Sequence, residues 1–440
     1  MEVLSLEGGK SDHEQKQNEY TFAATAHVVD NDSWQQVGLL LVTSFNCAYV
    51  LSFSSLMLAP LGWYWGLTCL VIIAAFAAYA NWLLAGFHVI NDHRFIRYRD
   101  LMGYVFGNRM YYVTWYLQFT TLILGSMGFI LLGGRALKEI NSEFSDSPMR
   151  LQVYIVATGV VYFVFAYFVP TISSMRNWLF SSAILTVIYD AAILVILIKD
   201  GNRNKVKDYN IVGNKTEKAL NAFGAIAAIL VCNTSGILPE IQSTVRKPVI
   251  TNMRKALPTQ YTIGLAIYYG ISIAGYWAYG ATVSAYLPEE LSGPTWAKVL
   301  INGTAFLQSI MSQHLFVAPI HEALDTRFQR LNEGMFSKYN LICRFFVRSL
   351  FFGFNILVAA LFPFMGDFVN LIGSFALFPL TFVFPSMIFL KIKGKDARKE
   401  QQLWHMAIVI FFSLMSIITT AAAVRLIIHN TKIYHFFANI

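Results

Sequence analysis

Charged residues are scarce in this sequence of 440 residues, because Asp, Glu, Lys and Arg together make up only 13% of it. Hydrophobic residues make up 56%, and the mean hydropathy is +0.51. A chain of this composition has too little polar surface to cover a soluble globule. The scarcity of charge therefore excludes a soluble protein and indicates an integral membrane protein.

Several chemical motifs are also missing. The sequence has no P-loop, no His/Cys cluster with the spacing of a metal site and no nucleophile motif. We therefore expect neither an enzyme nor an ATP-driven pump, and no cofactor or metal. The net charge of +8 resides on residues that flank apolar segments, which favours contact with anionic lipid and gives no reason to expect nucleic acid as a partner.

Cysteine is rare as well, and no secretory leader is evident. The four cysteines, Cys47, Cys69, Cys232 and Cys343, fall inside or at the edge of apolar segments, so we predict packing residues and no disulfide framework. The first 33 residues are polar and mixed in charge, without the basic and apolar pattern of a signal peptide.

Long apolar runs are abundant instead. A hydrocarbon core about 30 Å thick needs about 20 residues of helix. The runs are nearly continuous rather than alternating, which predicts helices and not a β-barrel. About eleven segments are long enough: 34–59, 62–87, 111–134, 151–170, 177–198, 219–241, 258–281, 296–320, 343–363, 367–390 and 403–428.

The distribution of basic residues predicts the orientation. With the N-terminus inside, inner segments hold 21 of the 33 Lys and Arg residues, which favours a cytosolic tail (1–33), a transmembrane domain (34–428) and an extracellular tail (429–440). The predicted outer loop 199–218 opposes this with six basic residues, but it also holds a glycosylation sequon at Asn214, which gives weak support.

The first segment has many polar residues for a membrane span. Residues 43–63 read TSFNCAYVLSFSSLMLAPLGW, with Ser44, Asn46 and Cys47 close together. One interpretation is a helix that unwinds within 44–50, where such side chains can satisfy freed backbone groups beside a cavity. The other is a continuous helix whose Ser and Asn side chains line a contact with another helix.

The sixth segment carries a clearer signal. Residues 227–248 read AAILVCNTSGILPEIQSTVRKP, so an apolar helix meets Cys-Asn-Thr-Ser-Gly and then Pro239 and Glu240. Pro and an acidic residue suit the first turn of a helix, which indicates that one helix stops and another begins. Interrupted first and sixth spans are the pattern of an inverted repeat of five plus five helices, with the eleventh helix added.

Longer stretches carry a family resemblance that extends over residues 34–428. They resemble the amino acid/auxin permease family, and most closely its plant proline-transporter (compatible-solute transporter) branch. The stretches are LPEIQSTVRKPVITNMRKAL (238–257), AGYWAYG (274–280), SGPTW (292–296), AFLQSIMSQHLFVAPIHEALDTRF (305–328), NCAYVLSFSSLMLAPLGW (46–63) and FPFMGDFVNLIGSF (362–375).

The resemblance implies a fold, an activity and a location. The fold is the all-α, leucine-transporter-like 5+5 inverted repeat with discontinuous helices 1 and 6. The activity is proton-coupled import of proline, glycine betaine and 4-aminobutyrate by alternating access at a plant plasma membrane. This sequence departs from the branch at Ala48, Val50, Ser52 and Ser55, where many relatives have glycine, and at Asp190, where an apolar residue is usual.

Substrate-binding residues follow from the two interruptions and from the eighth span, which faces the site in this fold. Backbone groups of the first interruption would take the substrate carboxylate and those of the second its amine. Aromatic faces would suit a secondary or quaternary amine, although packing is the commoner role for any one ring. The candidates are Asn46, Cys47, Ala48, Tyr49, Val50, Trp115, Tyr116, Phe119, Cys232, Asn233, Thr234, Ser235, Gly236 and Gln313.

Three residues are candidates for proton coupling. Asp190 lies inside an apolar span, where an acid is costly unless it is paired, protonated or solvated. Glu240 suits either the first turn of a restarted helix or a proton-linked role, and His314 either a satisfied bundle histidine or a proton relay. Arg344 and Arg348, near the start of the ninth span, are expected to reach lipid phosphate.

Two other functions stay possible on the sequence. One is a broader amino acid or auxin-like permease of the same fold, which competition between substrates would distinguish. The other is a sensor that binds an amino acid without transport. Short loops and a tail of 33 residues leave little room for a signalling extension, which makes the sensor less favoured.

Overall fold

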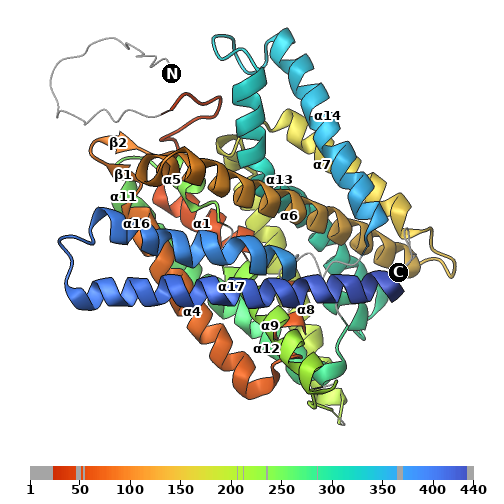
Figure 1. Cartoon of the computed structure of the whole chain (residues 1–440). Helices are drawn as coiled ribbons and strands as arrows, with labels where there is room; N and C mark the ends of the chain where they lie inside the picture. Colours follow the sequence, from red (N-terminus) through yellow and green to blue (C-terminus); the bar gives the residue numbers. More distant parts are fainter. Residues whose placement is uncertain are drawn as a thin grey trace.

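A computed structural model describes residues 23–45, 51–52, 55–205, 207–211, 213–233, 236–284, 286–363 and 370–433 of the chain. In these residues the fold is a bundle of helices with one small hairpin, in which β1 (Val89–Ile90) pairs antiparallel with β2 (His93–Arg94) (Figure 1). Eight helices of the described part are long and apolar enough to cross a membrane. The chain is therefore a multi-pass membrane protein, as the composition predicts.

The uninterrupted long helices coincide with the predicted spans. Most extend a few residues past them, because hydropathy marks the apolar part of a helix and not its polar ends. These helices are α4 (Gly62–Gly86), α6 (Asn108–Ser142), α7 (Leu151–Phe168), α8 (Arg176–Arg203), α13 (Thr295–Phe328), α14 (Lys338–Leu361) and α17 (Lys399–Ile433).

In the described residues, the first and sixth spans each contain separate helices. The first span has α1 (Trp34–Phe45) and α3 (Ser55–Leu58), and the sixth has α9 (Lys215–Asn233) and α10 (Leu238–Ser243). The restart at Leu238 has Pro in the first turn, as predicted. The first predicted interruption, residues 46–50, lies outside the described residues.

The two interrupted spans run antiparallel to each other. The chain before α1 is bonded to the end of α10, because the amide of Asn31 donates to the carbonyl of Thr244 (2.8 Å) and that of Arg246 to the carbonyl of Asp32 (2.9 Å). At the other end, α3 packs against α9.

The seventh and tenth spans contain π-helical turns that hydropathy does not reveal. In the seventh, η2 (Gln260–Gly264) joins α11 (Val249–Thr259) to α12 (Leu265–Tyr279). In the tenth, η5 (Ile372–Leu377) and η6 (Pro379–Val383) precede α16 (Phe384–Ile392). Pro379 lacks an N–H group, so the regular helical ladder cannot continue through it. Turns of this kind often occur at functional sites.

Short elements complete the described chain. The amphipathic α5 (Tyr98–Phe106) links the second and third spans. The remaining ones are the 3₁₀ turns η1 (Ser173–Met175), η3 (Gly280–Thr282) and η4 (Leu287–Glu290).

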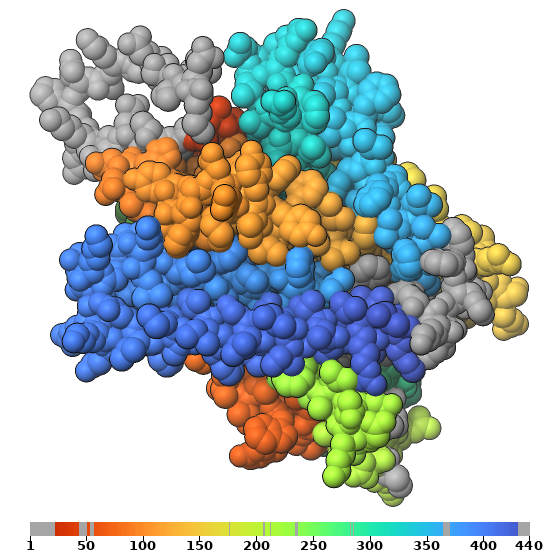
Figure 2. Space-filling view, viewed as in Figure 1, coloured from red at the N-terminus to blue at the C-terminus, as the bar shows by residue number. Residues whose placement is uncertain are grey.

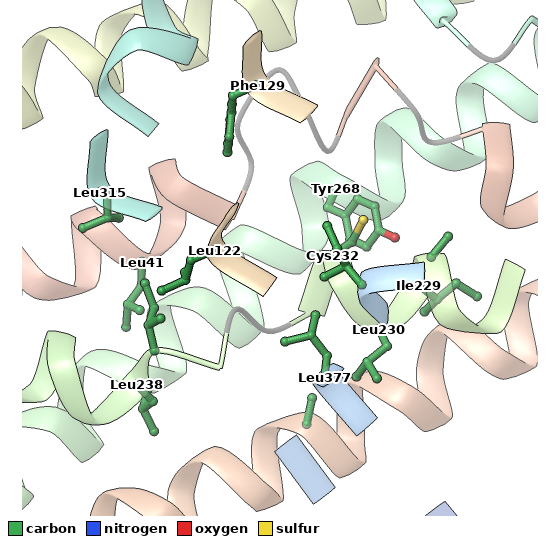
Figure 3. Packing of buried hydrophobic residues seen from close by; sticks show 14 of the residues in the cluster. Leu41, Leu122, Phe129, Ile229, Leu230, Cys232, Leu238, Tyr268, Leu315 and Leu377 are labelled. Carbon is green, nitrogen blue, oxygen red and sulfur yellow. The ribbon is translucent and has the colours of Figure 1, made fainter. Parts of the chain in front are cut away.

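One apolar cluster connects the helices, and apolar side chains also cover the outside. Leu41, Leu122 and Leu238, from α1, α6 and α10, belong to this cluster (Figure 3). On the surface, Leu350 is 78% exposed and Ile417 is 67% exposed. The face seen in Figure 2 is formed largely by α6, residues 372–392 and α17. Large exposed apolar residues on long helices are expected where lipid is the solvent.

The sequon at Asn214 has a structural explanation. Its side-chain Oδ1 accepts a hydrogen bond from the Glu217 amide (2.9 Å), and its own amide donates to Glu217 Oε2 (3.0 Å). This reciprocal pair is a capping box at the start of α9. Asn214 and Glu217 are thus accounted for by the helix start, and glycosylation stays a prediction.

Candidate functional site

The second interruption depends on a glycine. Gly236 has φ +68°, in the left-handed region, and a Cβ there would lie 3.1 Å from Leu380 Cδ1. The Gly236 carbonyl accepts a hydrogen bond from Gln118 Nε2 of α6 (2.9 Å). Gly236 is therefore held by α6 on one side and by the tenth span on the other.

We expect Gly236→Ala to weaken this turn. The left-handed conformation costs an L-residue about 1–2 kcal/mol. The added methyl group would also make a close contact with Leu380. Purified protein should unfold at a lower temperature, and transport should fall. Gly270→Ala on α12 is the matched control, because nothing lies within 4 Å of its added Cβ. A Gly236→Ala protein as stable as Gly270→Ala would contradict this account of the turn.

Glu240 joins three elements at the start of α10. Its Oε1 accepts hydrogen bonds from the Tyr98 amide (2.9 Å), the first residue of α5, and from Gln118 Nε2 (3.1 Å). The carboxyl group thus lies at the N-terminal ends of both α5 and α10. Two helix ends favour its charged form, whereas burial disfavours it.

The second oxygen of Glu240 is not used in these hydrogen bonds. Oε2 is buried and has no hydrogen-bond partner among the described residues. Glu240 lines two small cavities, of about 30 Å³ and about 10 Å³, and both are also lined by Arg97 and Glu322. Cavities of this size hold roughly one water each at most. Of the three candidate coupling groups, Glu240 is the one that lines them.

A segment of residues 24–32, here called the strap, covers the larger cavity. Arg97 bonds to both carboxylate oxygens of Glu322 on α13 and to the Ala24 carbonyl (2.8 Å). Thr25 Oγ1 also donates to Glu322 Oε1 (2.7 Å). We call this end of the bundle, where α1 begins and α13 ends, the strap end.

Further ion pairs fix the strap. Arg94 Nη1 lies 2.5 Å from Asp30 Oδ1, and its Nη2 donates to the Ser243 carbonyl at the end of α10 (2.8 Å). His27 Nε2 lies 3.6 Å from Asp325 Oδ2. The strap therefore connects the sixth span, α13 and the chain before α5, so the bundle is closed at this end.

Asp100 on α5 adjoins the strap pairs. Its Oδ2 lies 3.5 Å from Arg97 Nη1. Burial raises the pKa of the Asp100 carboxyl, although Arg97 and Arg99 act in the opposite direction. Arg97 thus faces two carboxylates, and Glu322 is the one that it binds closely.

A polar relay supports the end of α9. Asn81 Nδ2 on α4 donates to Tyr261 Oη (2.6 Å), and Tyr261 Oη lies 3.4 Å from the Asn233 carbonyl. Asn233 Nδ2 donates a hydrogen bond to the Ile229 carbonyl within α9 (2.7 Å). Cys232 lies beside the Tyr268 ring (Figure 3). Thr234 and Ser235 lie outside the described residues.

Sequence reasoning missed Tyr98, Gln118, Asn81 and Tyr261. A usable signal existed for Asn81 and Gln118, because amide side chains are rare inside apolar spans and face a partner there. No local pattern marks the two tyrosines in a chain with 22 of them.

Helix α13 contacts the first span through Gln308. Gln308 Nε2 donates to the Thr43 carbonyl near the end of α1 (3.2 Å) and to Ser312 Oγ (2.8 Å). Gln313 instead donates to Ser126 Oγ of α6 (3.0 Å). The carbonyl end of a half-helix is where transporters of this architecture hold cations, and here a neutral amide meets it.

Asp190 on α8 and His314 on α13 line neither of the two small cavities. Neither oxygen of Asp190 has a hydrogen-bond partner among the described residues, whereas its neighbour Tyr189 bonds to Ser52 Oγ beyond the first interruption (2.8 Å). His314 is fully buried, and its ring packs against Phe165 at 5.5 Å. Its two nitrogens also find no hydrogen-bond partner in the described part, so the satisfied-histidine interpretation gains no support.

The aromatic candidates of α6 divide between two environments. Trp115 and Phe119 line the smaller cavity with Glu240, and their ring centroids are 5.6 Å apart. Tyr116 is 60% exposed and packs on Phe375 of the tenth span at 6.1 Å. The structure therefore brings Trp115 and Phe119 to the site and leaves Tyr116 on the outer face.

The expectation that Arg344 and Arg348 reach lipid phosphate is wrong. Both side chains are fully buried. Arg348 Nη2 lies 3.0 Å from Asp325 Oδ2, and Arg344 Nη2 donates to the Met335 carbonyl (2.6 Å). A carboxylate and carbonyl groups from other elements thus bind one or two nitrogens of each guanidinium group inside the protein, and an i, i+4 spacing cannot reveal such partners.

Known proteins are similar to this chain over most of its length. A sequence model of the family described as transmembrane amino acid transporter protein matches residues 30–426. GABA transporter 1 of Arabidopsis thaliana is 31% identical over 447 aligned positions, which cover 98% of each chain. Lysine histidine transporter-like 6 of the same plant is 26% identical, over 90% of this chain and 91% of the relative.

Solved structures confirm the predicted fold class. Mhp1, a nucleobase-cation-symport-1 family transporter in a closed conformation with bromovinylhydantoin bound, aligns with a TM-score of 0.54 at 14% identity, over 90% of this chain and 91% of Mhp1. MhsT in complex with L-phenylalanine aligns with a TM-score of 0.52 at 11% identity, over 89% of this chain and 100% of MhsT. Both have the leucine-transporter-like arrangement.

Proposed function

Because this chain belongs to the transmembrane amino acid transporter family, we propose that it imports proline, glycine betaine and 4-aminobutyrate together with protons across a plant plasma membrane. The family supports amino-acid-like solutes as cargo, and the relative named GABA transporter 1 supports 4-aminobutyrate among them. The basic residues of the sequence favour a cytosolic strap end, which would make the described state closed toward the cytosol.

Substrate would bind between the two interrupted spans. In the proposal, the backbone of residues 46–50 takes the carboxylate, and the chain from Cys232 to Gly236 takes the amine. The carbonyl groups of Gly236 and Asn233 are positioned by Gln118 and Tyr261. These two residues would therefore act on substrate through the backbone that they hold.

We assign the coupling proton to Glu240. The observation that carries this assignment is its buried Oε2, which lacks a described partner, in a residue that lines both small cavities. A proton on Oε2 would remove a buried negative charge while Oε1 keeps its two hydrogen bonds. Since Gln118 bonds to both Glu240 and Gly236, protonation and the shape of the substrate turn would be linked.

Asp190 is the second candidate for the proton. Its carboxyl group belongs to an apolar span, and neither of its oxygens has a hydrogen-bond partner in the described part of the chain. Such a group is stable in a membrane only when it is protonated or reached by water. It is favoured less because it lines neither of the two small cavities.

Radiolabelled proline uptake in transport-deficient cells tests the proposed activity. Uptake should rise as the external medium is acidified and should fall sharply when a protonophore collapses the gradient. Competition by betaine and 4-aminobutyrate, but not by large neutral or acidic amino acids, is expected. Strong competition by large neutral or acidic amino acids would favour the broader permease. Uptake that changes neither with pH nor with the protonophore would contradict symport.

A further inference from the structure

A groove on the outer surface lies apart from the substrate region. It has a volume of about 820 Å³ and is lined by one face of α17, by the tenth span and by one residue of α6. Figure 2 shows these elements on one face of the molecule, with α17 in dark blue. Its apolar walls include Leu117, Phe375, Pro379, Val424 and Ile428.

The groove has the length of one lipid leaflet. On α17 it runs from Ser416 to Ile428, which is about 18 Å at 1.5 Å per residue. Half of a hydrocarbon core is about 15 Å. Because α17 begins at Lys399, Ser416 lies near the middle of the helix and Ile428 near its far end. The groove therefore extends from about the bilayer midplane to one interface.

A cation lies at the interfacial part of the groove. Arg425 is an exposed lining residue, and no carboxylate of the described residues forms an ion pair with it. The rest of the lining is apolar apart from the hydroxyl groups of Ser416 and Thr420, and Ser416 Oγ is bonded to the Ser374 carbonyl (2.7 Å). A guanidinium group binds phosphate through two parallel hydrogen bonds.

We propose that this groove is a specific phospholipid site, with one acyl chain along α17 and the lipid phosphate on Arg425. The occupant comes from the bilayer, since the groove opens on the lipid-facing surface and combines an apolar channel with a single cation. A phosphate group alone would leave the channel uncovered, and an uncharged chain alone would leave Arg425 without an anion.

The bound lipid would touch the supports of the substrate turn. Leu117 precedes Gln118, which bonds to the Gly236 carbonyl. Phe375 lies in η5, whose Gly373 approaches the Ala227 carbonyl of α9 closely, leaving no room for a Cβ. Lipid occupancy should therefore alter the transport rate of the bundle, whichever solute is carried.

Native mass spectrometry of the purified full chain tests the site, with phosphatidylglycerol as the added lipid. The wild type should bind one phospholipid that survives detergent washing. Arg425→Gln should weaken the affinity for this lipid roughly tenfold, because one charge-assisted hydrogen bond contributes about that factor. Ala421→Trp, which fills the groove, should abolish it, whereas Arg425→Lys should keep most of it.

Arg109→Gln is the matched control, because Arg109 is also an exposed cation at the end of a long helix but lies outside the groove. It should bind lipid as the wild type does. The proposal fails if Arg425→Gln and Ala421→Trp retain the lipid, if Arg109→Gln loses it equally, or if inorganic phosphate displaces it. All variants should elute as the same folded species, since the changed side chains lie on the exposed surface.

Discussion

Glu240→Gln is expected to lower proline uptake by at least about tenfold and to make the remaining uptake independent of pH. A tenfold decrease in rate corresponds to a free-energy difference of about 1.4 kcal/mol. Glutamine keeps an oxygen for the hydrogen bonds from Tyr98 and Gln118, so α5, α6 and α10 should stay in place. It replaces Oε2 by an amide that cannot titrate.

Initial uptake rates across mildly acidic to neutral pH, normalised to surface expression, measure this effect. Asp190→Asn is the matched variant, because it removes the rival carboxyl group and is expected to keep the wild-type profile. Proline binding to purified Glu240→Gln should persist, which separates lost coupling from a lost site. An unchanged profile for Glu240→Gln together with a flat one for Asp190→Asn would transfer the coupling role to Asp190.

Arg97→Ala should open the strap end of the bundle. Removing one partner of a buried ion pair costs roughly 3–5 kcal/mol, because the other charge stays buried and unpaired. Glu322 would be that charge, with Arg99 Nη2 still 3.6 Å from its Oε2, which places the cost at the lower end of this range. The strap would also lose its bond from Arg97 to the Ala24 carbonyl. The closed state should therefore lose population to one in which water reaches the cavity beneath the strap.

A cysteine in place of Ser243, which lines that cavity, reports the opening. Labelling of Ser243→Cys by a polar maleimide should be many times faster when Arg97→Ala is added, after correction for the native cysteines. Arg330→Ala is the control, because Arg330 pairs with Glu333 at the surface, where an ion pair contributes little to stability. Equal labelling in all three backgrounds would show that the strap is not a closure.

The membrane spans and the second interruption could be predicted from the sequence, because both depend on the chemistry of neighbouring residues. Hydropathy locates a helix that faces lipid, and Gly236 followed by Pro239 marks a stop and a start. The π-helical turns of the seventh and tenth spans leave no comparable mark, since one extra residue in a turn does not change an apolar run.

The partners of Glu240 could not be predicted, because Tyr98 lies 142 residues away in the chain. The partners of Arg344 and Arg348 could not be predicted either. Their sequence positions are typical of interfacial anchors, and their partners lie on α7 and α13, which are distant in sequence. Sequence position identifies a polar residue in a span, whereas the packing of helices distant in sequence decides whether that residue meets lipid, a partner or a cavity.

The most direct test of the central claim is proton movement driven by substrate. Purified protein would be reconstituted into vesicles that enclose a pH-sensitive dye, and proline would be added outside at equal pH on both sides. Coupled transport predicts that the vesicle interior acidifies as proline enters, and that Glu240→Gln vesicles take up no protons. Proline entry without any change of internal pH would contradict the account.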